Sequence, residues 1–187
     1  MRRREFIAGL AGTAAWPLAA RSQQHERVRR LGALLAFAEN DPAQQSWIKK
    51  LHEGLEKLGW QIGGNLRIEY RWAAGNVDRM RASATELVGL APDLLLAGNV
   101  PTTAALQRET RSIPIVFVQV ADPVVLGFVA SFAHPGGNIT GFMAVDSPMA
   151  GKRLEWLKSM APEVRRVAVM FNPVTSGRYM DGELREA

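Results

Sequence analysis

The sequence contains no cysteine among its 187 residues. This absence excludes a disulfide framework, a thiolate metal site, a cysteine nucleophile and a lipid anchor on cysteine. The three histidines, His25, His52 and His134, do not stand at the spacing of metal ligands, so no metal site is predicted. Neither a Gly-x-Ser-x-Gly elbow nor a Gly-x-Gly-x-x-Gly fingerprint occurs, and the sequence therefore predicts no catalytic residue and no cofactor.

Long hydrophobic runs are also missing beyond the N-terminus, where no stretch of about 18 uninterrupted apolar residues occurs. An internal membrane span is therefore not predicted. The net charge is +5, of which residues 1–22 carry +3 and the remainder only +2. Because so small a basic excess attracts phosphates weakly, no nucleic-acid partner is predicted. The rest of the composition is that of an ordinary globular chain of one to one and a half domains.

The first 22 residues have the three parts of an export signal. An arginine triplet at positions 2–4 precedes a short apolar run over 7–20, and small residues then stand just before Gln23. The start is also similar to the twin-arginine pattern, in Arg3-Arg4-Glu5-Phe6-Ile7. A general secretory signal that merely begins with arginines is the alternative. Residues 1–22 are thus predicted to be a signal peptide, and the mature protein is expected in the periplasm.

Strand and helix patterns alternate along the remainder of the chain. Short apolar or alternating runs predict strands over 28–37, 66–72, 93–97, 113–118, 138–142 and 166–171. Apolar residues at helical spacing predict helices over 42–58, 76–90, 101–110, 123–132 and 148–160. Repeated strand–helix units with short loops predict an α/β fold, a doubly wound parallel sheet with helices on both faces. The expected strand order is 2-1-3-4-5.

Ligands of doubly wound folds bind beyond the carboxyl ends of the strands, where the strand order reverses. That rule selects the loops 38–42, 98–103 and 119–123. In the second loop, Asn99 stands before a predicted helix that opens with Pro101, Thr102 and Thr103. Free N–H groups and hydroxyls at a helix start suit an anion such as a carboxylate. The alternative, of equal weight, is that Asn99 only caps the helix and the threonines only fill its first turn.

Two Asp-Pro pairs follow strands at the same edge. Asp122 comes after the fourth strand and Asp41 after the first, each directly before a proline. Asp122 can hold a cationic amino group of a ligand, or it can serve as an N-cap, and Asp41 has the same two interpretations. A carboxylate that faces a helix start suits a zwitterion, which favours an amino acid over a sugar.

Seven ordered segments resemble one family of proteins. They are GLEKLGW (54–60), IEYRWA (68–73), APDLLLAG (91–98), IPIVFV (113–118), ADPV (121–124), PGGNITG (135–141) and AGKRLE (150–155). Together they look like the substrate-binding proteins of ABC transporters with the type I periplasmic fold, in the branch that includes tryptophan- and phenylalanine-binding members. The resemblance runs from about residue 28 to residue 173.

In that family two similar α/β lobes close around a small ligand at a hinge. The resemblance implies a first ligand-binding lobe over 23–145 and the start of a second lobe over 146–187, which is expected to be incomplete because family members are much longer. The candidate binding residues that motif matching implies, together with Thr103 from the helix start, are Asp41, Asn99, Pro101, Thr102, Thr103, Asp122 and Asn172.

The function that the resemblance implies is an exported solute-binding component of an ABC importer, without catalysis of its own. Its partners would be a small-molecule solute, the permease subunits in the inner membrane and the export machinery. The chain is expected to be a truncated form with impaired binding, whose uncovered apolar faces favour aggregation. An exported α/β hydrolase-like enzyme and a non-catalytic sensory binding lobe remain the alternatives.

Overall fold

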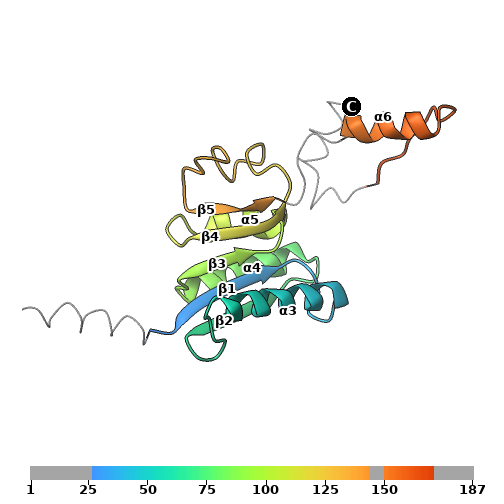
Figure 1. Cartoon of the computed structure of the whole chain (residues 1–187). Coiled ribbons are helices and arrows are strands. Elements are labelled where there is room, and N and C mark those ends of the chain that lie inside the picture. The colour runs from blue at the N-terminus through green and yellow to red at the C-terminus, as the bar shows by residue number, and fades with distance from the viewer. Residues whose placement is uncertain (1–26, 144–149, 171–187) are drawn as a thin grey trace, which may run out of the picture.

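The computed structural model describes residues 27–143 and 150–170 and contains a five-stranded parallel sheet flanked by helices (Figure 1). The strands are β1 (Arg29–Leu35), β2 (Leu66–Trp72), β3 (Leu94–Ala97), β4 (Ile115–Val120) and β5 (Ile139–Met143). The helices are α3 (Pro42–Lys57), α4 (Val77–Gly89), α5 (Val100–Glu109) and α6 (Ala150–Met160). Within these ranges, no helix has the length and apolar character needed to cross a membrane.

The strand order is β2-β1-β3-β4-β5, and all neighbouring strands run parallel. The predicted order and the doubly wound α/β fold class are thereby confirmed. Ala33 of β1 stands opposite Tyr70 of β2 on one side and opposite Leu96 of β3 on the other. Strand β2 is therefore added on one side of β1, whereas β3 and the later strands are added on its other side. The strand order reverses between β1 and β3, as predicted.

Helices cover both faces of the sheet (Figure 1). On the face of α4 and α5, the fully buried Leu87 and Leu106 belong to the same core cluster as Phe117 of β4. On the face of α3, Leu51 packs against a second cluster that includes Leu31 of β1. Because the central strands are buried on both sides, they read as continuous apolar runs rather than as alternating ones.

A polar contact ties α3 to the edge strand β2. The Nε2 atom of His52 lies 2.7 Å from the Oη atom of Tyr70, whose ring stacks on Trp72 with 6.0 Å between centroids. Partial burial raises the pKa of Tyr70 to about 12. The phenol therefore stays neutral and keeps this contact well above neutral pH.

The predicted helix over 123–132 is wrong, because this segment forms turns. It begins as one helical turn, in which the N–H of Leu126 donates to the carbonyl of Asp122 at 3.2 Å. Gly127 then adopts a φ of +71° and ends the turn. Apolar residues of the segment, among them Phe128, are buried in the core without a helical backbone. The apolar spacing therefore reflected the burial of an irregular loop.

The predicted strand over 166–171 is also wrong over its described part, since residues 166–170 have no regular secondary structure. Val167 and Val169 are about half exposed. A strand needs a partner for its backbone groups, and no described strand pairs with this segment. The helix predicted before it is confirmed as α6. The predicted signal peptide, the predicted lobe boundary at 145–146 and Asn172 lie outside the described residues.

Candidate ligand-binding site

The carboxyl ends of β1, β3 and β4 lie along one edge of the sheet, at the arrowheads in Figure 1. The segments 36–41, 98–99 and 121–123 follow these three strands. Since β1 and β3 are the strands between which the direction reverses, this edge is where a doubly wound sheet binds its ligand. The three segments carry candidate residues that the sequence singled out.

Asn99 opens α5 through a capping box with Thr102. The Oδ1 atom of Asn99 accepts the backbone N–H of Thr102 at 3.3 Å, and the Oγ1 atom of Thr102 accepts the backbone N–H of Asn99 at 3.0 Å. The hydroxyl of Thr103 donates to the carbonyl of Asn99 at 2.7 Å. Both threonines are fully buried. The capping interpretation is confirmed. Through their hydrogen bonds to Asn99, the two buried hydroxyls fix the conformation of the loop after β3.

Asp122 follows β4 with a backbone φ of +41°, a conformation that non-glycine residues adopt rarely. Its Oδ1 atom accepts the backbone N–H of Val125 at 3.0 Å. A carboxylate has two acceptor oxygens, so Asp122 can close this turn through Oδ1 and present Oδ2 to a cationic group. The structural and the ligand-binding interpretations are therefore compatible at this residue.

Asp41 has the same dual character at the start of α3. Its Oδ1 atom accepts the backbone N–H groups of Ala43 at 2.9 Å and Gln44 at 3.1 Å. Pro42 occupies the first turn, where a missing N–H costs nothing. The N-cap interpretation is confirmed, and Oδ2 lies outside these two hydrogen bonds.

The structure thus places Asp41, Asn99 and Asp122 on segments that follow three adjacent strands. Pro101 stands beside them in the first turn of α5, partly exposed. Two carboxylates and the positive end of a helix dipole are suited to a ligand that carries both an ammonium group and a carboxylate. Among the described residues, no group of three or more His, Asp or Glu side chains is arranged to hold a metal ion.

One residue of this edge was missed by reasoning from the sequence. Gln119, near the end of β4, is exposed and has a φ of +55°. It lies in the loop 119–123 that the edge rule selects. No local signal marks it, because glutamine is not among the residues that favour turns.

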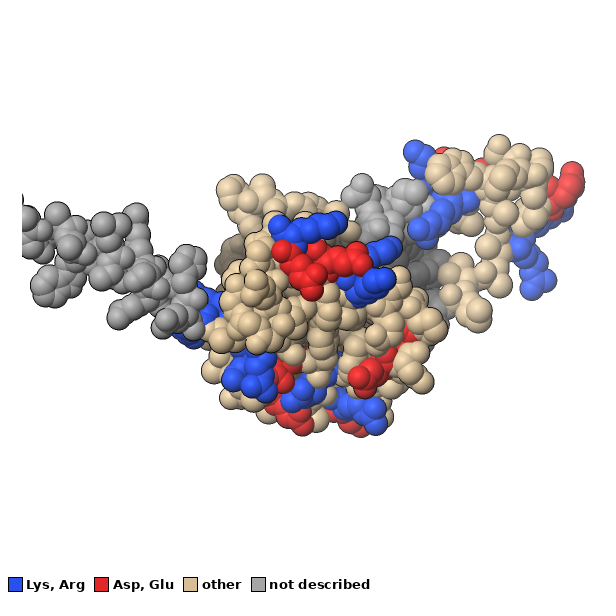
Figure 2. Space-filling model, turned by 60° about the horizontal axis from the view of Figure 1, so that its bottom comes forward, with Lys and Arg blue, Asp and Glu red and all other residues tan. Residues whose placement is uncertain are grey.

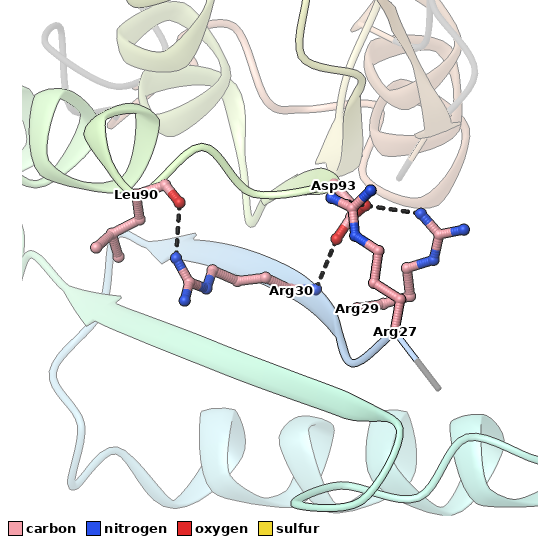
Figure 3. Close-up of polar contacts among 5 residues, drawn as sticks. All are labelled: Arg27, Arg29, Arg30, Leu90 and Asp93. Carbon is pink, nitrogen blue, oxygen red and sulfur yellow. Dashed lines mark hydrogen bonds and ion pairs between the residues drawn. The ribbon is translucent and has the colours of Figure 1, made fainter. Parts of the chain in front are cut away.

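The opposite, amino edge of the sheet is held together by Asp93 (Figure 3). Its Oδ2 atom accepts a hydrogen bond from the backbone N–H of Arg30 at 2.9 Å, and its Oδ1 atom accepts one from the guanidinium of Arg29 at 2.8 Å. The guanidinium of Arg27 forms an ion pair with the same oxygen at 3.4 Å. The Arg30 guanidinium donates to the carbonyl of Leu90 at 2.7 Å. The Arg30 N–H, and next the Arg29 guanidinium, lower the pKa of Asp93. This cluster joins β1 to the turn before β3 and has a structural role.

Charges of both signs are mixed on the face shown in Figure 2, without a broad area of one sign. Ion pairs among the described residues include Arg71 with Glu86, at 2.8 Å. Two surface grooves are lined by residues other than the candidate binding residues. One of about 340 Å³ runs along α3 beside His52, and one of about 150 Å³ lies between α6 and residues 164–167. We assign no ligand to either groove.

The fold and its ligand edge together define a lobe of the periplasmic binding protein type I class. Residues 33–180 match the family described as ABC transporter substrate binding protein, and the protein belongs to this family. A tyrosine-binding protein from Clostridioides difficile (strain R20291) is 31% identical over 145 residues, which are 76% of this chain and 39% of that protein. Family membership supports a binding protein rather than an enzyme.

Solved structures share this fold. A conserved domain protein from Vibrio cholerae has a TM-score of 0.74 at 30% identity, over 85% of this chain and 53% of that one. An ABC domain from Streptococcus pneumonia in complex with L-Trp has a TM-score of 0.71 at 21% identity, over 83% and 52%. The ligand-free, open form of CD0873 from Clostridium difficile has a TM-score of 0.61 at 28% identity, over 85% and 53%. The chain spans about half the length of these solved relatives.

Proposed function

We propose that this protein is the exported, periplasmic solute-binding component of an ABC importer and that it captures an amino acid at the carboxyl edge of its sheet. Membership of the family supports the transport role. The observation that carries the ligand class is the placement of Asp122 after β4, next to the strand that leads into α5. The carboxylate of Asp122 follows β4, and the positive N-terminal end of α5 follows the adjacent strand β3.

The chemistry of an amino acid matches this pair of groups. The N-terminal end of α5 attracts the carboxylate, because the helix dipole is positive there. The Oδ2 atom of Asp122 accepts from the ammonium group, with Asp41 as a second negative charge further along the edge. Asn99 forms the surface between the two ends of the ligand, and the buried Thr102 and Thr103 fix its position.

The remaining contacts complete the proposed site. Pro101 lines the edge beside Asn99. Asn172, which lies outside the described residues, is proposed as a contact from the second lobe on its motif match alone. The names of two relatives favour an aromatic side chain on the ligand, since one is a tyrosine-binding protein and another holds L-Trp. The protein partners in this proposal are the permease subunits of the inner membrane and, through residues 1–22, the export machinery.

The described lobe on its own is proposed to bind its ligand weakly. Small-molecule sites gain affinity by enclosing most of the ligand's surface. Asp41, Asn99 and Asp122 lie instead along the edge of a single sheet, which contacts one side of a ligand. We expect dissociation constants of about 1 mM, near the weak end of specific binding.

The test is a ligand titration of the full chain followed by NMR, with L-tyrosine and L-tryptophan as probes and glucose as the sugar control. Asp122→Asn keeps an oxygen for the Val125 N–H and tolerates a positive φ, but it removes the charge. Its affinity for the amino acids should fall about tenfold, as expected for one charged hydrogen bond. Asp78→Asn, a change at a 93% exposed carboxylate in the first turn of α4, is the matched control and should bind like the wild type.

Two results would overturn the proposed function. The first is binding of glucose with no response to either amino acid. The second is hydrolysis of a common ester or peptide substrate that disappears in Asp122→Asn, which would favour the exported enzyme instead.

A further inference from the structure

The pairing of β4 with β5 contains one extra residue on β4. Phe117 stands opposite Gly141, and Val120 stands opposite Met143. Two residues of β4, Val118 and Gln119, therefore face only one residue of β5. This is a β-bulge, a feature that re-aims side chains and is frequent next to functional sites.

The bulge changes which side chain of β4 enters the core. Ile115 and Phe117 are buried on the face of α4 and α5, so strict alternation would direct residue 119 to the same face. The extra residue shifts the alternation by one, and Val120 is fully buried in its place. Gln119 is thereby kept out of the core and exposed at the carboxyl edge.

The backbone of Gln119 is strained at this position. Its φ of +55° lies in the left-handed region, which Gly, Asn and Asp occupy far more readily than Gln. Glycine would meet the backbone requirement without strain. Strained residues of this kind cluster at ligand-binding sites, where the side chain is needed in spite of its backbone.

The register places Gln119 beside the candidate residues already described. Ala97 of β3 stands opposite Phe117 of β4, so Asn99 and Gln119 each lie two residues beyond that pair. Asp122 follows Gln119 three residues later on the same segment. Gln119 is therefore on the strand next to the α5 start and just before the carboxylate.

We infer that Gln119 is a further ligand-contacting residue that helps to select an α-amino acid, an inference that rests on the proposed function. Its side-chain amide offers two N–H donors and one oxygen acceptor. Between the α5 start and Asp122, the donors suit the ligand carboxylate and the oxygen suits its ammonium group. A ligand with only one of these groups loses part of the contact.

Two substitutions distinguish the effect of the Gln119 side chain on binding from the effect of its backbone conformation. Gln119→Gly removes the amide and relieves the strain, whereas Gln119→Leu removes the amide at similar size and leaves the strain in place. Both should weaken binding of L-tyrosine or L-tryptophan by about three- to tenfold, the effect of one lost hydrogen bond. The melting temperature of Gln119→Gly should not fall below that of the wild type.

Ala91→Gly is the matched control for strain relief. Ala91 has a φ of +47° in the turn between α4 and β3, at the opposite edge of the sheet. This variant should bind both amino acids like the wild type.

The measurement is an NMR titration of the full chain with L-tyrosine and L-tryptophan, together with thermal unfolding of each variant. Wild-type affinity in Gln119→Leu would overturn the inference even if Gln119→Gly bound weakly, because only the backbone would then matter. Equal weakening by Ala91→Gly would overturn it as well. If the wild type bound neither amino acid, the proposed function itself would fail and this inference with it.

Discussion

At the residue scale, Gly141 of β5 is constrained by its partner across the sheet. It pairs with Phe117 of β4, and a Cβ atom at position 141 would lie 2.6 Å from the Phe117 ring and also against its carbonyl oxygen. Phe117 is almost fully buried, so neither its ring nor its backbone can move away without disturbing the core. Packing, and not an unusual φ, therefore requires glycine here.

We expect Gly141→Ala to lower the free energy of unfolding by about 2–3 kcal/mol, as overpacking a rigid site does. Urea unfolding measures the change. The control is Gly137→Ala, because a Cβ atom at that position meets nothing within 4 Å. The control should change stability by less than about 1 kcal/mol. Equal stability of the two variants would contradict the packing argument.

Some candidate site residues could be predicted from the sequence because the helix-capping pattern that marks them also fixes where they lie in the fold. Asp41 and Asn99 are helix caps, and in a strand–helix unit the cap directly follows the carboxyl end of the strand. The capping pattern therefore places them at the ligand edge. Gln119 has no such signal, since its exposure depends on the bulge between β4 and β5. Strand pairing of that kind is a long-range property that a local pattern does not contain.

At the element scale, the strand order and most elements could be predicted, while some boundaries could not. The bounds of β2 are those that its alternating pattern predicts. Strand β4 begins two residues later than predicted because Pro114 has no N–H to donate and the carbonyl of Ile113 accepts instead from the Asn138 side chain at 2.7 Å. The hydrogen bond between Asn138 and Ile113 joins parts of the chain that are distant in sequence, so the periodicity of apolar residues does not predict it.

Asp93 joins two elements, and its substitution should loosen their connection. Asp93→Asn retains an acceptor for the Arg30 N–H but loses the charge that pairs with Arg29. Because the Asp93 side chain is only 21% exposed, its ion pair is partly shielded from water. We therefore expect Asp93→Asn to lower the free energy of unfolding at pH 7 by about 1 kcal/mol. Urea unfolding of the wild type and the variant measures this difference.

The effect of Asp93→Asn should depend on pH. The pKa of Asp93 is lower in the folded state than its ordinary value of 3.8. Its ionised form therefore contributes full stability above that value, and this contribution is lost as the pH falls through the lower folded pKa. The difference between wild type and Asp93→Asn should shrink below about pH 4. A difference that grows in acid would contradict the assigned sign.

At the scale of the whole molecule, several large apolar side chains of the described residues remain exposed, among them those on β5 and in the segment that contains α6. Phe142 on β5 is 72% exposed, and among the described strands only β4 pairs with β5. In the segment that contains α6, Met160 is 79% exposed and Val169 about half exposed. Exposed strand edges and apolar surfaces favour pairing with other chains. We therefore expect the 187-residue chain to self-associate as its concentration rises.

A pair of double variants tests whether the segment around α6 drives this association. Met160→Lys with Val169→Lys replaces two exposed apolar side chains, whereas Ser159→Lys with Ala168→Lys adds the same charge at neighbouring exposed positions that have little apolar surface. Sedimentation velocity over a range of concentrations should show association of the wild type and of the control pair, and a shift toward monomer for the first pair alone. Equal suppression by both pairs would assign the effect to net charge. A wild type that stays monomeric throughout would contradict the prediction itself, because its exposed apolar side chains would then have too little surface to hold two chains together.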